Sequence, residues 1–257
     1  MQKKQDHTLV KPHIQAPVAL ITGAARRIGA ATAEYLHKQG FRVLIHYLQS
    51  KKEAESLSKR LNDTRNNSAK IVSGDLLVKE TAKRLIQEAM DWAGRLDALV
   101  NNASLFKPTD FSKPNEGDWE ALFVANVRAP FWLSLEAYPY LSETKGCIIN
   151  ITDIHSDKPL KGYAVYCQTK AALNMQTKAL AREFAPLVRV NAVAPGAIVW
   201  PEEDNTLTPD LKAKIINATP LKQHGDPIYI AQAVCSLIDN PFITGEILRV
   251  DGGRSIV

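Results

Sequence analysis

Short apolar runs alternate with amphipathic stretches along nearly the whole chain. Seven runs predict strands, over residues 18–22, 42–46, 70–73, 96–100, 147–151, 188–193 and 247–250. The runs barely alternate in polarity, as expected for parallel strands that are buried on both faces. Six helical patterns lie between them, over residues 28–39, 51–62, 79–93, 119–141, 163–184 and 227–239. Repeated strand–helix units predict an α/β fold, a single doubly wound parallel sheet of about seven strands with helices on both faces.

Nothing in the composition divides this pattern into separate units. Residues 17–257 therefore predict one domain, preceded by a flexible arm over residues 1–16. Gly40 follows the first helix as a C′ glycine should. Pro130 interrupts the fourth helical pattern and is expected to kink it. The turn formers and acids of residues 196–209 predict a mobile loop, a candidate lid over a site.

Charge, cysteine content and hydropathy exclude several classes of protein. The net charge is +5, but the basic residues are scattered among 27 acidic ones, which argues against a nucleic-acid surface. The three cysteines are widely spaced, so neither a disulfide framework nor a zinc site is expected. The absence of a disulfide framework predicts a cytoplasmic location. No stretch has the apolar length of a membrane span, and the N-terminus lacks the apolar core of a signal peptide.

The segment after the first strand has the position of a phosphate-binding turn. Gly23 permits a tight turn and Gly29 permits close packing of the helix that opens at Ile28. Free backbone N–H groups and the helix dipole would then bind the pyrophosphate of a dinucleotide. Arg27 replaces the usual middle glycine, so an ordinary strand–helix turn with surface arginines is the alternative.

The end of the second strand indicates which dinucleotide binds. NAD enzymes usually place an acid there for the ribose hydroxyls, whereas this strand ends in His46 and Tyr47 and is followed by Leu-Gln-Ser50. Arg26 lies in the glycine turn, and arginine suits a 2′-phosphate. The sequence therefore predicts NADPH, with Tyr47 and Ser50 as contacts or, alternatively, as parts of a solvated loop.

The next two strands also end in candidate cofactor residues. Asp75 and Leu76 follow the third strand, where Asp75 would contact the adenine or, alternatively, lie in the first turn of a helix. Asn101 and Ala103 end the fourth strand, in the crevice where nucleotides bind.

The strongest catalytic candidates are Tyr166 and Lys170, four residues apart on one predicted helix. An ammonium beside the hydroxyl is expected to lower the tyrosine pKa, which suits a general acid in hydride transfer. The same spacing recurs at Tyr47 and Lys51, so it means little without its setting. Asp153, which ends the preceding strand, is the second catalytic candidate or, alternatively, only begins a turn.

Taken together, these motifs make residues 17–254 resemble the short-chain dehydrogenase/reductase family. The matching pieces are TGAARRIG, NNAS, Asn126, the Tyr166/Lys170 pair, Pro195-Gly196 and VDGG. The resemblance implies that Tyr166 is the acid, that Lys170 lowers its pKa and binds the nicotinamide ribose, and that Asn126 holds a water relay. It also implies a homotetramer. For Asn126 a purely structural role in the helix is the alternative.

Within that family the chain looks like the pteridine and dihydromonapterin reductases. Arg27 in place of glycine, Asp153 in place of serine, Phe106 after NNAS and the HYxxS strand end carry this resemblance. It implies a dihydropterin substrate, with dihydrofolate as a second candidate. The flat pterin would lie against Phe106, and Trp200 would cover it. Arg27 would contact the cofactor phosphate, the pterin or both, and Ser104 would contact the pterin or the cofactor. Phe106 is, alternatively, a core aromatic.

Two departures and two rival functions accompany this prediction. The subgroup often has a serine after Pro-Gly and an arginine in the second-strand motif, where this chain has Ala197, Ile198 and Gln49. The first rival function is reduction of a 3-oxoacyl or other ketone substrate, which Asp153 disfavours because an acid opposes a developing oxyanion. The second is a non-catalytic NADP-sensing module, which would need neither Tyr166 nor Lys170.

Overall fold

A computed structural model describes residues 16–200 and 207–257 of the chain. Its centre is a sheet of seven parallel strands in the order β3-β2-β1-β4-β5-β6-β7. The strands are β1 (Val18–Ile21), β2 (Arg42–Tyr47), β3 (Ala69–Ser73), β4 (Ala98–Asn101), β5 (Cys147–Ile151), β6 (Arg189–Pro195) and β7 (Ile247–Val250). The predicted doubly wound α/β fold is confirmed.

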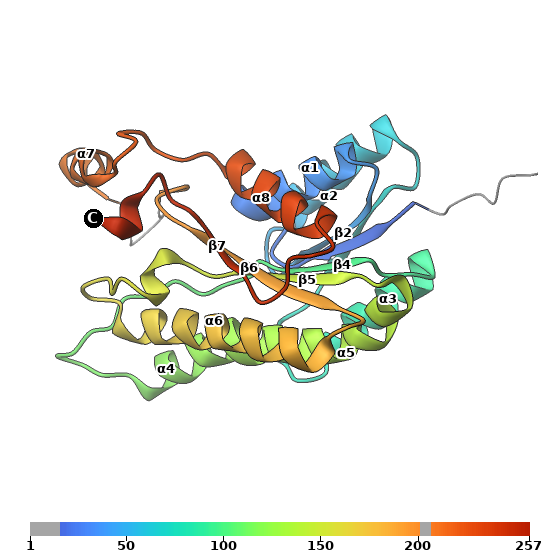
Figure 1. The fold of residues 1–257 in the computed structure, drawn as a ribbon, viewed down its shortest axis with the longest axis horizontal. Helices are drawn as coiled ribbons and strands as arrows, with labels where there is room; N and C mark the ends of the chain where they lie inside the picture. Colours follow the sequence, from blue (N-terminus) through green and yellow to red (C-terminus); the bar gives the residue numbers. More distant parts are fainter. Residues whose placement is uncertain (1–15, 201–206) are drawn as a thin grey trace, which may run out of the picture.

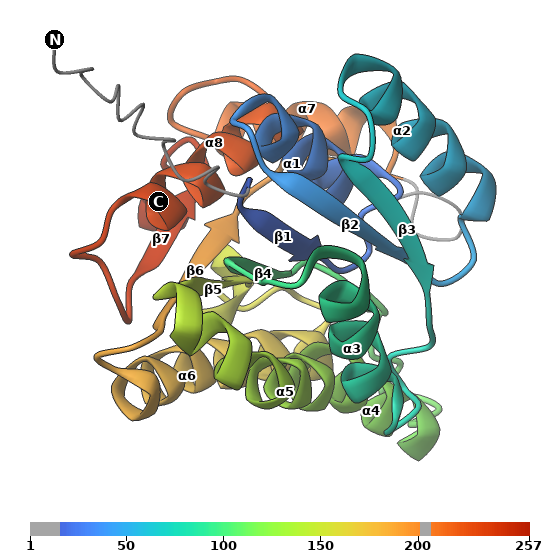
Figure 2. The same ribbon diagram turned by 90° about the vertical axis from the view of Figure 1, so that its right-hand side faces the viewer.

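Helices cover both faces of the sheet, as Figures 1 and 2 show. One face carries α1 (Arg27–Lys38), α2 (Lys51–Thr64) and α8 (Pro227–Asp239). The other carries α3 (Thr81–Ala93), α5 (Ala129–Thr144) and α6 (Ala164–Phe184). The two apolar cores lie between these layers, one around Leu36 and Val234 and the other around Leu85 and Leu133. Because both faces are covered, the central strands β1, β4 and β5 are buried along their whole length, which explains their lack of alternation.

The seven predicted strands are all present, with ends that shift by up to two residues. Gly40 adopts a positive φ of 97° and its N–H bonds to the His37 carbonyl, as a C′ glycine does. One helix was not predicted, α7 (Pro209–Ala218). Its N-cap residue is Thr208, whose side chain accepts a hydrogen bond from the Leu211 N–H. Helix α7 buries none of its residues, although Leu211, Ile215 and Ala218 stand at helical spacing in its sequence.

The helix predicted over residues 119–141 is three segments in the structure. These are α4 (Glu116–Phe123), a π-helical turn (Val124–Arg128) and α5. Pro130 lies in the first turn of α5, directly after the π turn, rather than in the middle of a regular α-helix. Proline has no N–H for the carbonyl four residues earlier, that of Asn126, and the π turn accommodates this loss. Pro139 is the proline inside the helix proper.

The carboxyl ends of the strands meet along one edge of the sheet. The strand order reverses at β1, which pairs with β2 on one side and β4 on the other. In open α/β sheets, ligands bind outside the carboxyl ends of strands at such a reversal. The residues after β1, β2, β3, β4, β5 and β6 are therefore the ones positioned to form a site.

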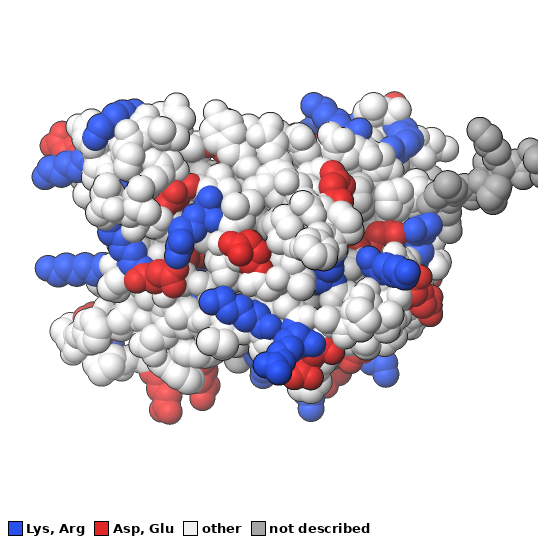
Figure 3. Space-filling view, in the orientation of Figure 1, with Lys and Arg blue, Asp and Glu red and all other residues white. Residues whose placement is uncertain are grey.

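The surface carries basic and acidic side chains interspersed, as the face in Figure 3 shows. In the described part of the chain, no helix has the length and hydropathy needed to cross a membrane. Within residues 16–200 and 207–257, no group of three or more His, Cys, Asp or Glu side chains could hold a metal ion.

Candidate active site

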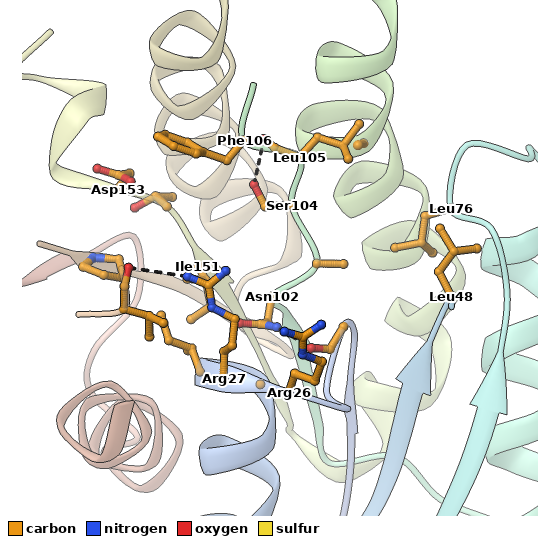
Figure 4. Close-up of a pocket in the computed structure, with 18 of the residues that line it drawn as sticks. Arg26, Arg27, Leu48, Leu76, Asn102, Ser104, Leu105, Phe106, Ile151 and Asp153 are labelled. Carbon is orange, nitrogen blue, oxygen red and sulfur yellow. Dashed lines mark hydrogen bonds between the residues drawn. The ribbon is translucent and has the colours of Figure 1, made fainter. Parts of the chain in front are cut away.

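A cavity of about 660 Å³ opens at the carboxyl ends of the strands. Figure 4 shows it extending from Arg26, Leu48 and Leu76 at one end to Phe106 and Asp153 at the other. All but five of the site residues predicted from sequence line it, and the exceptions are Tyr47, Ser50, Asn101, Asn126 and Trp200. Residues that line it without having been predicted are mostly apolar or small, such as Leu48, Leu105 and Ile198.

The glycine turn between β1 and α1 is as compact as its sequence predicted. Gly23 has a positive φ of 60°, and a Cβ there would lie 3.1 Å from the Cα of Ala103. A Cβ on Gly29 would lie 2.3 Å from the Gly23 carbonyl oxygen, so the helix start packs directly on the turn. No side chain caps the first turn of α1 and no acid lies in it. The open helix N-terminus therefore suits an anion.

Arg27 occupies the middle-glycine position in a left-handed conformation, with φ of 57°. This conformation costs a residue with a Cβ about 1–2 kcal/mol, whereas glycine adopts it freely. The Arg27 guanidinium donates to the carbonyl of Trp200 at 2.9 Å and to that of Val199 at 3.4 Å. It thereby ties the glycine turn to the segment that follows β6, across the mouth of the cavity (Figure 4).

The end of β2 carries no acid, since Leu48, Gln49 and Ser50 follow Tyr47. Leu48 and Arg26 line the same end of the cavity. Tyr47 is buried in the apolar core, 9% exposed, rather than in a solvated loop. Ser50 is the N-cap residue of α2 and lies outside the cavity lining.

His46 and Asp75 both line the cavity, with different surroundings. His46 is buried and bonded to backbone groups through both ring nitrogens. The Asp75 carboxylate accepts from the Leu77 N–H at 2.9 Å in a local turn. Helix α3 begins at Thr81, several residues after Asp75. The alternative that placed Asp75 in the first turn of a helix is therefore wrong.

Asn101 points away from the cavity into a buried polar network. Its side-chain amide donates to the Asn150 oxygen at 2.9 Å, and Asn150 donates to Thr177 at 2.9 Å. The neighbouring Asn102 lines the cavity instead, and its amide donates to the carbonyls of Thr22 and Gly23 at 2.8 and 3.0 Å. Alternation along a strand places the two asparagines on opposite sides.

Tyr166 and Asp153 meet at the end of the cavity that Phe106 lines. The Tyr166 hydroxyl donates to one Asp153 carboxylate oxygen at 2.7 Å, and the other oxygen accepts from the His155 N–H at 2.8 Å. Asp153 also begins the short 3-10 turn Ile154–Ser156. Asp153 therefore both begins a turn and accepts a hydrogen bond from Tyr166. The two alternatives for Asp153 in the sequence analysis, a site residue and the start of a turn, are compatible.

The electrostatics of Tyr166 differ from the sequence prediction. Burial, followed by the negative charge of Asp153 and the hydrogen bond to it, raises the pKa of Tyr166 well above its ordinary value. The prediction of a lowered pKa is wrong for this state of the protein, because it considered only the lysine. A raised pKa keeps the hydroxyl protonated, which is the form that a proton donor requires.

Lys170 lies one helical turn along α6 and is 2% exposed. Its ammonium donates to the Ile151 carbonyl at 3.0 Å and lies 5.6 Å from the centroid of the Tyr166 ring. Burial lowers the Lys170 pKa to about 8, against an opposing effect of Asp153. The amine is thus poised to change its charge within the range of working pH.

Asn126 lies in the π turn and supports the site from behind. Its side-chain oxygen accepts from the Leu105 N–H at 2.8 Å and from the Ser104 hydroxyl at 3.1 Å. Its amide donates to the Leu105 carbonyl at 2.9 Å and to Thr169 at 3.0 Å. The side chain therefore holds the segment that carries Ser104 and Phe106 against α6.

Phe106 belongs to an aromatic group and also lines the cavity. Its ring stacks on Tyr163 at 4.4 Å between centroids and meets Tyr166 edge-on at 4.8 Å. The Trp200 ring lies outside the cavity lining and stacks on His224 at 4.2 Å. The predicted lid spans residues 196–209, and residues 201–206 of it lie outside the described residues.

These features fit a nicotinamide dinucleotide. The glycine turn, the uncapped start of α1 and the small residue Ala103 allow close approach of a pyrophosphate and ribose. Arg26 supplies positive charge at the end of the cavity where an NAD enzyme would place an acid. Tyr166 and Lys170 lie at the other end, where the reactive ring would be.

Comparisons with known proteins agree with this site. A family model described as enoyl-(acyl carrier protein) reductase matches residues 23–255. A putative ketoacyl reductase of granaticin polyketide synthesis from Streptomyces violaceoruber is 32% identical over 249 residues, 95% of this chain and 98% of that one. Pteridine reductase 1 of Leishmania tarentolae is 34% identical over 285 residues, 94% of this chain and 97% of that one.

A third relative, 3-oxoacyl-[acyl-carrier-protein] reductase of Staphylococcus epidermidis, is 34% identical over 239 residues, 91% of this chain and 97% of its own length. The identities to the pterin and oxoacyl enzymes are equal, so they do not distinguish the substrate. Fold, site and relatives agree on the family, and the chain belongs to the short-chain dehydrogenase/reductase family of NAD(P)H-dependent oxidoreductases.

Proposed function

We propose that the protein is an NADPH-dependent reductase of dihydropterins, with dihydrofolate as a second substrate of the same class. The observation that carries the proposal is the 2.7 Å hydrogen bond from the Tyr166 hydroxyl to Asp153. It joins the proton donor to a carboxylate at the position where a ketone reductase would have a serine. A carboxylate only accepts hydrogen bonds, so this site favours a substrate that carries N–H groups.

When bound, NADPH supplies the hydride that reduces the pterin C=N bond. Tyr166 supplies the proton to the nitrogen, since burial and Asp153 keep its hydroxyl protonated. The Lys170 ammonium stabilises the phenolate that remains, and Asp153 orients the hydroxyl and accepts from a substrate N–H. The Asn126 carbonyl, which Pro130 cannot satisfy, is the atom we assign to hold water for reprotonation.

The substrate end of the cavity supports a flat heteroaromatic. Phe106 lines it with one ring face covered by Tyr163, so a pterin would stack against the opposite face. Offset stacking contributes about 0.5–1.5 kcal/mol beyond burial. Ser104 and Asp153 offer polar groups at the same end, and Arg27 lies at the mouth.

Reduction of a 3-oxoacyl or ketone substrate is the second candidate, favoured by the two ketoacyl and oxoacyl relatives. The two functions can be separated by following NADPH oxidation with a dihydropterin, dihydrofolate and an acetoacetyl thioester side by side. We expect turnover with the dihydropterin and little with the thioester. Turnover with the thioester alone would overturn the pterin proposal, and no turnover with any of them would favour a non-catalytic NADP-binding role.

Replacing Asp153 by serine tests the observation that carries the proposal. The change replaces a carboxylate, which accepts hydrogen bonds, with a hydroxyl, which can donate one. The kcat for the dihydropterin should therefore fall about 10²-fold or more. The dissociation constant for NADPH should change much less. Asp157→Ser is the matched control, because Asp157 pairs with Arg249 on the surface and lies outside this cavity. An equal effect of the two substitutions would contradict the role of Asp153.

We also propose that the protein acts as a cytoplasmic homotetramer. The exposed Trp132 on α5 and Met175 on α6 offer apolar contacts on the outer helical layer. Light scattering coupled to size-exclusion chromatography gives the mass directly, and a monomeric mass at micromolar concentration would contradict the proposal.

A further inference from the structure

His46 joins three strand ends through a single buried side chain. It lies near the end of β2 and is 2% exposed. Its Nδ1 atom lies 3.1 Å from the Gly23 nitrogen in the glycine turn, and its Nε2 atom lies 2.9 Å from the Gly74 carbonyl oxygen after β3. We call this arrangement the His46 bridge.

The two partners fix the protonation state of the imidazole. The Gly23 N–H can only donate, so Nδ1 must accept, and the Gly74 carbonyl can only accept, so Nε2 must carry the proton. The ring is therefore a neutral imidazole of one tautomer. Burial lowers the pKa of His46 against the opposing effect of the Gly74 hydrogen bond, and the nearby charge of Arg84 acts in the same direction as burial. A protonated ring would lose the bond to Gly23.

Both ends of the bridge line the cofactor cavity. Backbone bonds run beside it, from the Ala24 N–H to the His46 carbonyl at 2.8 Å and from the Gly74 N–H to the Tyr47 carbonyl at 3.0 Å. On the opposite side, Asn102 holds the Gly23 carbonyl at 3.0 Å. The glycine turn is thus held from β2 on one side and from β4 on the other.

We propose that His46 is a positioning residue for the dinucleotide, which sets the glycine turn and the Gly74–Asp75 segment relative to each other. The inference rests on the proposed NADPH site. It assigns His46 to the geometry of the turn rather than to a direct contact with the reacting atoms. Loss of the bridge should therefore weaken cofactor binding more than it slows the chemical step.

Three substitutions separate the two bonds. In His46→Asn the amide oxygen can replace Nδ1, which keeps the bond to Gly23, whereas in His46→Gln the amide nitrogen can replace Nε2, which keeps the bond to Gly74. His46→Phe keeps the ring and loses both bonds. His37→Phe is the matched control, because His37 is also buried and hydrogen-bonded, to Ser68 at 2.7 Å, but lies outside the cavity.

The measurement is the dissociation constant for NADPH by fluorescence titration, together with steady-state kinetics. We expect His46→Phe to raise the dissociation constant about tenfold or more and to raise KM for NADPH by a larger factor than it lowers kcat. His46→Asn should stay closest to the unsubstituted protein, with His46→Gln between them. His37→Phe should lower the melting temperature without changing the dissociation constant beyond about twofold.

The pH dependence gives a readout that a merely structural role would not move. As the pH falls below 6.5, the ordinary histidine pKa, protonation of His46 should weaken NADPH binding in the unsubstituted protein more than in His46→Asn, since an amide does not titrate there. Arg84 on α3 and Arg26 and Asp75 in the cavity lining are common to both proteins. The difference between the two profiles therefore isolates the imidazole.

Hydrogen exchange of the Gly23 amide tests the bridge without any cofactor. The amide should exchange faster in His46→Gln than in His46→Asn, because only the latter keeps its acceptor. Equal NADPH affinity and equal Gly23 exchange in all folded His46 variants would overturn the inference. If the unsubstituted protein binds neither NADPH nor NADH, the proposed function fails, and the exchange rates still decide whether the bridge exists.

Discussion

Two tyrosine–lysine pairs of identical spacing lie in different regions of this molecule. Tyr166 and Lys170 share α6, and both are buried beside the cavity. Tyr47 ends β2 inside the apolar core, and Lys51 begins α2 with its side chain 65% exposed and paired with Glu55. The same four-residue step therefore brings a tyrosine and a lysine together beside a cavity only where one helix carries both residues.

The difference lies in the surroundings of each pair. At the α6 pair, burial raises the pKa of Tyr166 and lowers that of Lys170 to about 8, so both groups depart from their ordinary behaviour. The β2 pair has no carboxylate corresponding to Asp153 among the described residues, and its lysine is solvated. Perturbed groups gathered in a cavity are a physical mark of a functional site.

Substitution of the tyrosines is expected to give the largest contrast. Tyr166→Phe removes the proton donor and should lower kcat by about 10² to 10⁴-fold, with little change in NADPH affinity. Tyr47→Phe removes a hydroxyl that lies outside the cavity lining and should change kcat by less than about threefold. Steady-state rates with a dihydropterin measure both. If Tyr166→Phe turns over like the unsubstituted protein, Tyr166 is not the proton donor.

Substitution of the lysines is expected to give the next contrast. Lys170→Met removes the charge that stabilises the phenolate, which should lower kcat/KM by about 10 to 10³-fold. Lys51→Met removes only an exposed ion pair with Glu55 and should leave kinetics unchanged. Equal loss of activity in the two variants would contradict a specific role for Lys170, because the place of the lysine on α6 beside the cavity would then make no difference.

The pH profile should show the charge of Lys170 directly. The lysine is protonated below its pKa of about 8 and neutral above it, so the phenolate loses its partner as the pH rises. The profile of kcat/KM for NADPH reports the free enzyme, and it should bend downward near pH 8 with a limiting slope of about tenfold per pH unit. Lys51→Met should keep this bend, whereas Lys170→Met should remove it.

Stability should respond in the opposite direction, as the smallest effect. The folded protein lowers the Lys170 pKa from 10.5 to about 8, so the buried ammonium costs stability at pH 7 and that cost disappears as the pH approaches 10.5. Lys170→Met should therefore raise the free energy of unfolding at pH 7 by on the order of 1–3 kcal/mol. Denaturant unfolding at pH 7 and pH 10 measures the change, and a gain that does not shrink at pH 10 would exclude this cause.

Much of the fold was predictable because short apolar runs recur regularly along the chain and the central ones are buried on both faces of the sheet. Strands β1 to β7 and the helices between them follow from that pattern. Helix α7 was not predicted, because its ten residues are too few for a strong periodic signal, although Thr208-Pro209-Asp210 is a recognisable helix start. The π turn was not predicted either. Pro130 indicates that the helical hydrogen-bond pattern is interrupted, but the sequence does not show at which residues the backbone departs from the α-helix.

The candidate site was predictable where its residues follow strand ends, since parallel strands bring these ends together. Gly23, Ala103 and Asp153 are of this kind. The sequence could not show that Asn102, and not Asn101, faces the cavity, because one residue of register decides it. Nor could it show the raised pKa of Tyr166, which depends on burial and on a partner thirteen residues away along the chain.

The π turn at Val124–Arg128 acts as a phase shift between α4 and α5. It contains one residue more than the same length of α-helix would. The side chains of α4 are therefore rotated about the helix axis by about 100° relative to those of α5. Deleting a single residue from the turn would restore an unbroken helix while swinging Asn126 away from Ser104 and Thr169. A protein so altered could keep its helix content yet lose the support behind Phe106, so spectroscopic helicity alone would not reveal the damage.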